Sequence, residues 1–188
     1  MHPLRLASLS IALLAICALP AFAADLAGVE MGDKITVGDQ DLVLNGMGLR
    51  SKMMFKVYVA GLYLPEKASS ADAIFKADAT RHLAMRWLRN VGKEDICGGW
   101  DEGLAANTAN ASAALQKQFE MLCNYMADAK KKDLHTYTYT PGKGTRIEIG
   151  GKETGTIEGK EFADALWACW IGPKPGPGED FKSGLLGR

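Results

Sequence analysis

The chain has 188 residues, of which 22 are acidic and 22 are basic, so its formal net charge at pH 7 is zero. Nucleic-acid-binding proteins usually carry a clear basic excess, and this balance argues against a polyanionic partner. Hydrophobic residues make up 47% of the chain, which is typical of a folded globular domain. No apolar run reaches the roughly 20 residues that a membrane-spanning helix needs, and we expect no stable membrane span.

The N-terminus predicts a cleavable secretory signal. Arg5 lies in a short basic start, residues 11–20 are apolar, and Ala21–Ala23 provide the small-x-small pattern of a cleavage site. A lipoprotein signal centred on Cys17 is the alternative, but the bulky isoleucine before it argues against that reading. Cleavage at the end of the signal leaves 21 basic and 22 acidic residues, a net charge near −1. We therefore expect a periplasmic or secreted protein with a single domain at 24–188.

Strand patterns dominate the first part of the mature chain. Lys34–Val37 and Asp41–Asn45 predict two short strands, and the glycines of Asn45–Gly48 predict a turn or loop. Met53–Leu64 alternates with a period of two residues and is partly apolar on both faces, which indicates a strand with both faces partly buried. Ser69–Lys76 predicts a short helix capped by one of its first two serines.

A second strand pattern and a long helical segment follow. Thr80–Arg89 alternates as a strand, and Lys93–Lys132 has a helical composition. Glycines at 98, 99 and 103 predict either two helices or one kinked helix in this segment. The basic run Lys130–Lys132 lies at the expected end of the helical segment, where it would complement the helix dipole.

The last part of the chain alternates again and then ends in a helix. Three further strands are predicted at Leu134–Thr140, Arg146–Ile149 and Lys152–Ile157, the last two joined by a hairpin turn at two glycines. Glu161–Trp170 has apolar residues at helical spacing and predicts a packed helix. The order of strands, helices, strands and helix predicts an α+β fold, with helices gathered on one face of an antiparallel sheet.

Three cysteines, Cys97, Cys123 and Cys169, follow the predicted signal. An exported protein meets an oxidising compartment, which favours one disulfide and one remaining thiol. Cys97 and Cys123 both lie in the helical segment and are the first candidate pair. Buried, reduced cysteines are the alternative.

Motifs for the common catalytic chemistries are missing from the sequence. His82 and His135 are the only histidines after the signal, and neither has a second ligand at metal-binding spacing. The sequence has no G-x-S-x-G elbow, no C-x-x-C pair and no Walker loop. We therefore expect no metal and no cofactor.

One pair of residues suggests an anion site. Arg50 follows the glycine-containing loop and precedes the strand that carries Tyr58. Arginine stays charged, and its planar fork can bind a carboxylate or phenolate through two hydrogen bonds. Tyr58 shares a strand face with Lys56 and Ala60, and its hydroxyl would add a second contact. The alternative is a solvated loop arginine and a core tyrosine.

The segment from Gly48-Leu49-Arg50 to Leu64 resembles the chalcone isomerase family, and the resemblance extends over roughly residues 30–187. The ending Leu185-Leu186-Gly187 is similar to that of bacterial chalcone isomerase-like proteins, which also carry signal peptides. The resemblance implies an open-faced β-sandwich, in which a large antiparallel sheet has helices layered on one face.

In the plant enzymes of this family, a phenolate adds to an enone and closes a flavanone ring. The resemblance implies that Arg50 would hold the phenolate and that Asn107 would match an assisting helix asparagine. Three supporting positions differ from the enzymes. Trp100 stands at the tyrosine position, Tyr58 replaces a strand threonine, and the serine or threonine of a later helix falls near Ala163.

The combination of Arg50 with Tyr58 is more similar to the non-catalytic branch that binds fatty acids. There the two residues hold the carboxylate and an apolar cleft takes the acyl chain, which Met53 and Met54 would help to line here. We therefore expect a hydrophobic anion, a fatty acid or a phenolic compound, bound by Arg50, Tyr58, Trp100 and Asn107. An intramolecular lyase, in which Arg50 and Asn107 would be catalytic, and an envelope protein-interaction module are the alternatives.

Overall fold

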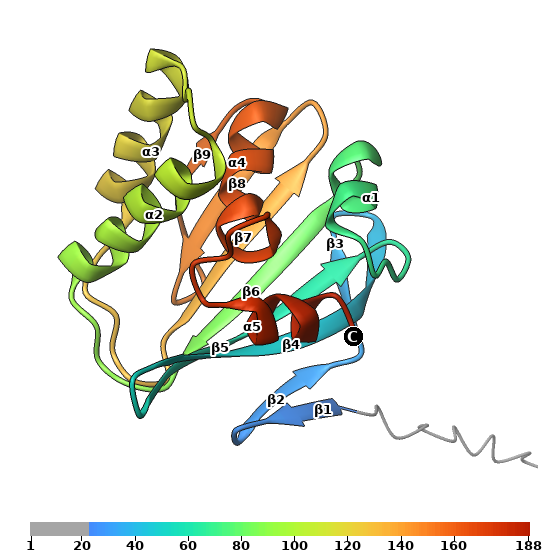
Figure 1. The fold of residues 1–188 in the computed structure, drawn as a ribbon. Helices are drawn as coiled ribbons and strands as arrows, with labels where there is room; N and C mark the ends of the chain where they lie inside the picture. Colours follow the sequence, from blue (N-terminus) through green and yellow to red (C-terminus); the bar gives the residue numbers. More distant parts are fainter. Residues whose placement is uncertain (1–22) are drawn as a thin grey trace, which may run out of the picture.

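The computed structural model describes residues 23–188, so the predicted signal peptide lies outside the described residues except for its last alanine. Its centre is a seven-stranded antiparallel sheet in which every strand pairs with its neighbour along the chain (Figure 1). The strands are β3 (Lys34–Val37), β4 (Gln40–Lys52), β5 (Phe55–Leu64), β6 (Arg81–Trp87), β7 (Leu134–Thr140), β8 (Gly144–Ile149) and β9 (Lys152–Ile157).

The helices cover one face of this sheet (Figure 1). They are α1 (Ala71–Lys76), α2 (Lys93–Asn107), α3 (Ala113–Tyr125), α4 (Lys160–Ile171) and α5 (Glu179–Leu185). Apolar residues of all five helices pack with the facing strand residues in one continuous core. The predicted α+β class, with helices on one face of an antiparallel sheet, is confirmed.

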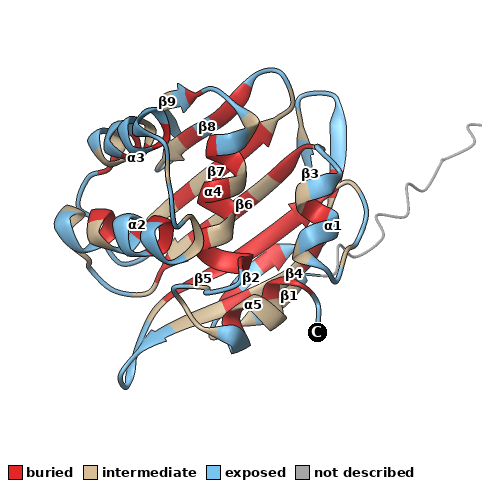
Figure 2. Ribbon diagram, turned by 45° about the horizontal axis from the view of Figure 1, so that its top comes forward, coloured by how far each residue is buried: buried red, intermediate tan, exposed pale blue. Residues whose placement is uncertain are grey.

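The alternation predicted for β5 separates two cores. Tyr58, Ala60 and Leu62 face the helices, whereas Val59 and Tyr63 belong to a second apolar cluster. This second cluster includes residues of a small hairpin formed by β1 (Ala23–Leu26) and β2 (Val29–Gly32). Figure 2 shows the resulting bands of buried residues along the central strands. The hairpin was not predicted, and its first strand begins at Ala23, the last residue of the predicted signal.

Gly46 and Gly48 do not form the predicted turn, because β4 continues through this segment, with an irregularity in its pairing with β5 between Leu44 and Gly46. Both glycines allow α5 to approach the sheet closely. A Cβ atom at Gly48 would lie 2.7 Å from the carbonyl oxygen of Phe181, and one at Gly46 would clash with the backbone of Gly184. Asn45 fixes the same contact, since its Nδ2 donates to the carbonyl oxygen of Leu185 at 2.7 Å.

The helical segment also divides at a different place from the one predicted. Gly98 and Gly99 lie inside α2, and the break falls at 108–112. There Ser112 caps α3 by accepting a hydrogen bond from the backbone N–H of Leu115. Gly103 is required for packing, since a Cβ there would lie 2.6 Å from the sulfur of Cys169. At Gly103 this close contact outweighs the roughly 1 kcal/mol helix penalty of glycine, whereas a Cβ at Gly98 or Gly99 would meet open space.

Candidate functional site

A cavity of about 350 Å³ lies between the sheet and the helices. This volume is within the range of about 300–1,000 Å³ typical of small-molecule sites. Its sheet wall includes Arg50 from β4, Tyr58 from β5 and Met85 and Trp87 from β6. Its helical wall includes Ile96, Gly99 and Trp100 from α2 and Cys169 and Trp170 from α4. Exposed residues Lys52, Met53, Phe55 and Arg89 also line it and form its rim.

Arg50 and Tyr58 are direct cross-strand partners in the β4–β5 pair. Residues opposite each other in an antiparallel pair project from the same face, and both of these side chains line the cavity. Arg50 is half-buried, and its Nη1 donates to the backbone oxygen of Gly176 at 2.6 Å. This bond uses one of the five guanidinium N–H groups and fixes the position of the charge.

Tyr58 is buried and remains protonated. Burial raises the pKa of its phenol to about 12, although the positive charge of Arg50 and a hydrogen bond with Trp170 act in the opposite direction. Its ring meets the ring of Trp87 edge-on, with centroids 5.3 Å apart, and packs in the same way against Phe181 at 5.7 Å. A neutral, fixed phenol beside a cation provides a hydrogen-bond donor rather than a proton-transfer group.

Trp100 lines the cavity as the ligand prediction requires, and Trp87 lines it as well. Both indole N–H groups are buried and have no hydrogen-bond partner within residues 23–188. Trp100 is held edge-on by Trp170, with ring centroids 5.1 Å apart. The two rings therefore contribute apolar surface to the cavity wall, while their N–H groups are not exposed to the cavity. Strand alternation placed Trp87 on this face, but nothing in the sequence singled it out as a site residue.

Asn107 lies outside the cavity lining. Its Nδ2 donates to the backbone oxygens of Gly103 and Lys174, and its Oδ1 accepts from the backbone N–H of Lys174. These bonds use the amide to attach the loop after α4 to the end of α2. The structure therefore brings Arg50, Tyr58 and Trp100 together and gives Asn107 a structural position. Met53 lies at the rim, while Met54 does not line the cavity.

Cys97 and Cys123 form a disulfide that joins α2 to α3, with Cα atoms 5.4 Å apart. Cys169 is free and buried in the cavity wall, and burial raises the pKa of its thiol to about 12. Burial also lowers the pKa values of His82 and His135 to about 4. Within the part of the chain that the structure describes, no group of three histidine, cysteine, aspartate or glutamate residues could hold a metal ion.

The family model described as chalcone isomerase-like matches residues 23–187. The chain belongs to the chalcone isomerase-like family. Among solved structures it is similar to a fatty-acid binding protein of Arabidopsis thaliana, with a TM-score of 0.68 and 16% sequence identity. The similarity covers 88% of this chain and 96% of the plant chain. It confirms the predicted fold. No curated protein matches the sequence.

The family assignment and the fold agree with the resemblance drawn from the segment around Arg50. Across residues 23–188, none of the helices has both the length and the apolar character needed to span a bilayer.

Proposed function

We propose that this chalcone isomerase-like protein binds a hydrophobic carboxylate, most simply a fatty acid, without chemically changing it. The observation that carries the proposal is the position of Arg50 and Tyr58, side by side on one wall of a cavity with many aromatic and aliphatic lining residues. The charged residues Lys52, Arg89, Asp95 and Glu102 also line it. The arginine would hold the carboxylate, and the neutral phenol would donate a further hydrogen bond. That the plant protein of similar fold is a fatty-acid binding protein supports this ligand class.

Ring closure of the chalcone isomerase type is less well supported. The buried phenol of Tyr58, with a pKa of about 12, is a poor proton-transfer group near neutral pH. Trp100 offers only an N–H donor where the enzymes have a tyrosine, and Ala163 is fully buried without a hydroxyl. Arg50 alone would have to stabilise the phenolate. The loss of chalcone absorbance over time, measured with the wild type and with Arg50→Ala, tests this alternative. Equal rates for the two proteins would eliminate it.

A role limited to protein interaction in the envelope does not account for the cavity. The cavity has a volume of about 350 Å³, within the range of small-molecule sites, and most of its lining residues are apolar. These features support a small ligand.

Palmitate binding, measured by isothermal titration calorimetry on delipidated protein, tests the carboxylate site. We expect Arg50→Ala to weaken binding at least tenfold, because hydrogen bonds to a charged group contribute about 1.5–3 kcal/mol. Arg50→Lys should be intermediate, since it keeps the charge but loses the planar fork. Tyr58→Phe should weaken binding by a smaller factor.

Arg146→Ala is the matched control, because Arg146 is an exposed arginine of β8 that pairs with Glu148. It should leave the affinity unchanged. The proposal fails if Arg50→Ala binds palmitate as tightly as the wild type, or if the uncharged hexadecanol binds equally well.

We further propose that the protein is exported and oxidised. The pattern of residues 1–23 and the Cys97–Cys123 disulfide support this proposal. Mass spectrometry of the native protein should find Ala24 at the N-terminus. Alkylation of the denatured, unreduced protein should modify Cys169 but neither Cys97 nor Cys123. An intact N-terminal segment, or alkylation of all three thiols, would contradict the proposal.

A further inference from the structure

The hairpin between β4 and β5 ends in three exposed, large apolar residues. Met53, Met54 and Phe55 are 91%, 92% and 55% exposed, and Figure 2 shows the hairpin tip as an exposed extension from the sheet. Turns of this kind normally carry Gly, Asn, Asp or Ser. Met53 even occupies the left-handed backbone region, with φ of 57°, which glycine or asparagine adopts more readily. The tip therefore departs from the local rules, as functional sites often do.

Basic residues surround this tip. Lys52 and Lys56 are exposed on either side of it, and the guanidinium carbon of Arg89 lies 4.7 Å from the centre of the Phe55 ring. This contact connects the tip to the end of β6 and to the segment beyond it.

The run Lys130–Lys132 lies next to that end of β6. The backbone N–H of Lys131 donates to Oδ1 of Asn90, and that of Lys132 donates to the carbonyl oxygen of Trp87. The run is thus not the predicted complement of a helix dipole, because α3 already ends at Tyr125. All three lysines are exposed.

Acidic groups in the same loops are partly engaged with the backbone. Asp128 accepts from the backbone N–H of Lys93, and Asp133 accepts from that of Lys130. Asp95 and Glu102 also line the cavity. Six cations nevertheless lie on the hairpin tip and on the segments beside the end of β6, in a chain whose net charge is close to zero: Lys52, Lys56, Arg89 and Lys130–Lys132. Exposed apolar residues with adjacent basic groups match the chemistry of an anionic bilayer surface.

We propose that the hairpin tip docks this protein on an anionic phospholipid membrane. Met53, Met54 and Phe55 enter the boundary between headgroups and acyl chains, and these six cations contact the headgroups. Because Lys52, Met53, Phe55 and Arg89 also form the cavity rim, docking brings the cavity mouth to the membrane. A hydrophobic carboxylate then passes between bilayer and cavity without crossing water. This last step rests on the proposed function, whereas docking itself does not.

Flotation with lipid vesicles tests the docking. The mature protein is mixed with vesicles of pure phosphatidylcholine or of 70% phosphatidylcholine and 30% phosphatidylglycerol at low ionic strength. We expect at least fivefold more bound protein on the anionic vesicles, and a marked loss at 0.5 M salt, where charges are screened within a few Å.

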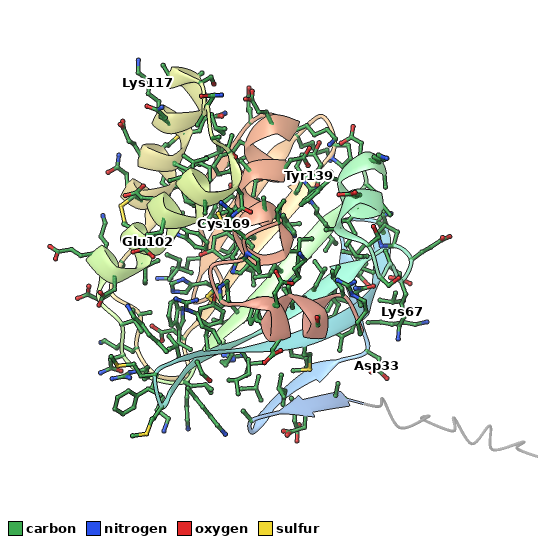
Figure 3. The ribbon with its side chains drawn as sticks, viewed as in Figure 1. Asp33, Lys67, Glu102, Lys117, Tyr139 and Cys169 are labelled. Atoms are coloured by element: carbon green, nitrogen blue, oxygen red, sulfur yellow. A yellow bond between two sulfur atoms is a disulfide. The ribbon has the colours of Figure 1, made fainter. Side chains whose placement is uncertain are left out.

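Two variants outside the cavity lining separate the apolar and the electrostatic contributions. Met54→Asp and Lys56→Glu should each reduce vesicle binding at least fivefold. Their controls are Met121→Asp and Lys117→Glu, the same substitutions at exposed positions of α3. Figure 3 labels Lys117 on α3, on the opposite side of the molecule from the hairpin tip. Both controls should bind vesicles like the wild type.

Palmitate titration without vesicles keeps the two proposals distinguishable. Met54→Asp and Lys56→Glu should retain wild-type palmitate affinity, because neither residue lines the cavity. Vesicle binding without palmitate binding would overturn the proposed function and leave docking intact. Docking itself is overturned if the wild type does not prefer anionic vesicles, or if the tip variants bind like their controls. It is also overturned if gel filtration shows that the tip instead joins two copies of the chain.

Discussion

Asn107 and Lys174 exchange two hydrogen bonds, one in each direction, between the end of α2 and the loop after α4. The side-chain nitrogen of Asn107 donates to the carbonyl oxygen of Lys174 at 2.9 Å, and its oxygen accepts from the Lys174 N–H at 2.8 Å. The same loop is held at Gly176 by Arg50. The asparagine thereby holds the loop that contacts Arg50, and it does not itself line the cavity.

Asn107→Asp should destabilise the fold, because the carboxylate cannot donate to the oxygens of Gly103 and Lys174. Hydrogen bonds left unmade typically cost about 1–3 kcal/mol, and urea denaturation followed by circular dichroism would measure the difference. Asn124→Asp, at an exposed position of α3, is the control and should change stability little. Equal stability of the two variants would contradict the structural role of Asn107.

Substitution of alanine for glycine should have opposite effects at two positions. Gly46→Ala places a Cβ against the backbone of Gly184 and should separate α5 from β4, which lowers the free energy of unfolding. Gly98→Ala meets open space inside α2 and should raise stability by about 0.5–1 kcal/mol. Thermal unfolding of both variants checks the pair. A loss of stability in Gly98→Ala would contradict the continuous α2 helix through position 98.

Arg81 and Asp164 form an ion pair at the end of the core remote from Trp87 along β6. The guanidinium is only 1% exposed, while Asp164 is 31% exposed and also pairs with Lys160. Removing one partner of a buried pair leaves the other charge uncompensated and costs about 3–5 kcal/mol. Asp164→Ala leaves the buried guanidinium of Arg81 without its ion-pair partner, whereas in Arg81→Met the carboxylate of Asp164 still pairs with Lys160. Asp164→Ala should therefore destabilise the fold more than Arg81→Met. Urea midpoints in the reverse order would contradict this reading.

The two buried histidines predict a loss of stability in acid. Burial lowers the pKa values of His82 and His135 from 6.5 to about 4, so the unfolded chain binds more protons between these values. The free energy of unfolding should therefore fall as the pH decreases from about 6.5 towards 4. Each histidine should contribute a decrease of up to about 1.4 kcal/mol for each pH unit. His135→Phe should reduce this slope, because it removes one of the two groups that take up a proton on unfolding. The ring nitrogens of His135 have no partner within the described residues, so the substitution breaks no hydrogen bond. An unchanged slope would show that His135 is not protonated on unfolding.

The sequence was sufficient to predict the elements whose pattern is local. Period-two alternation in β5 and β6 and helical spacing in α4 show which face of each element is buried, and the order of elements then indicated an antiparallel sheet with helices on one side. The segment from Gly48 to Leu64 was enough to indicate the family. It also singled out Arg50 and Tyr58, because a cation before a strand and a tyrosine on one strand face can be seen in the sequence.

Features that depend on contacts between distant residues required the tertiary structure. Gly46 and Gly48 have the composition of a turn, and only the approach of α5 shows that they are packing positions in a strand. Asn107 meets Lys174 across 67 positions of the chain, so its hydrogen bonds have no local signature. Similarly, Arg89 meets Phe55 only when β6 pairs with β5, and Lys130–Lys132 reach the end of β6 only when the loop after α3 folds back beside it. The local residue pattern shows which face of a strand or helix is buried, whereas the packing of distant segments determines which residues that face contacts.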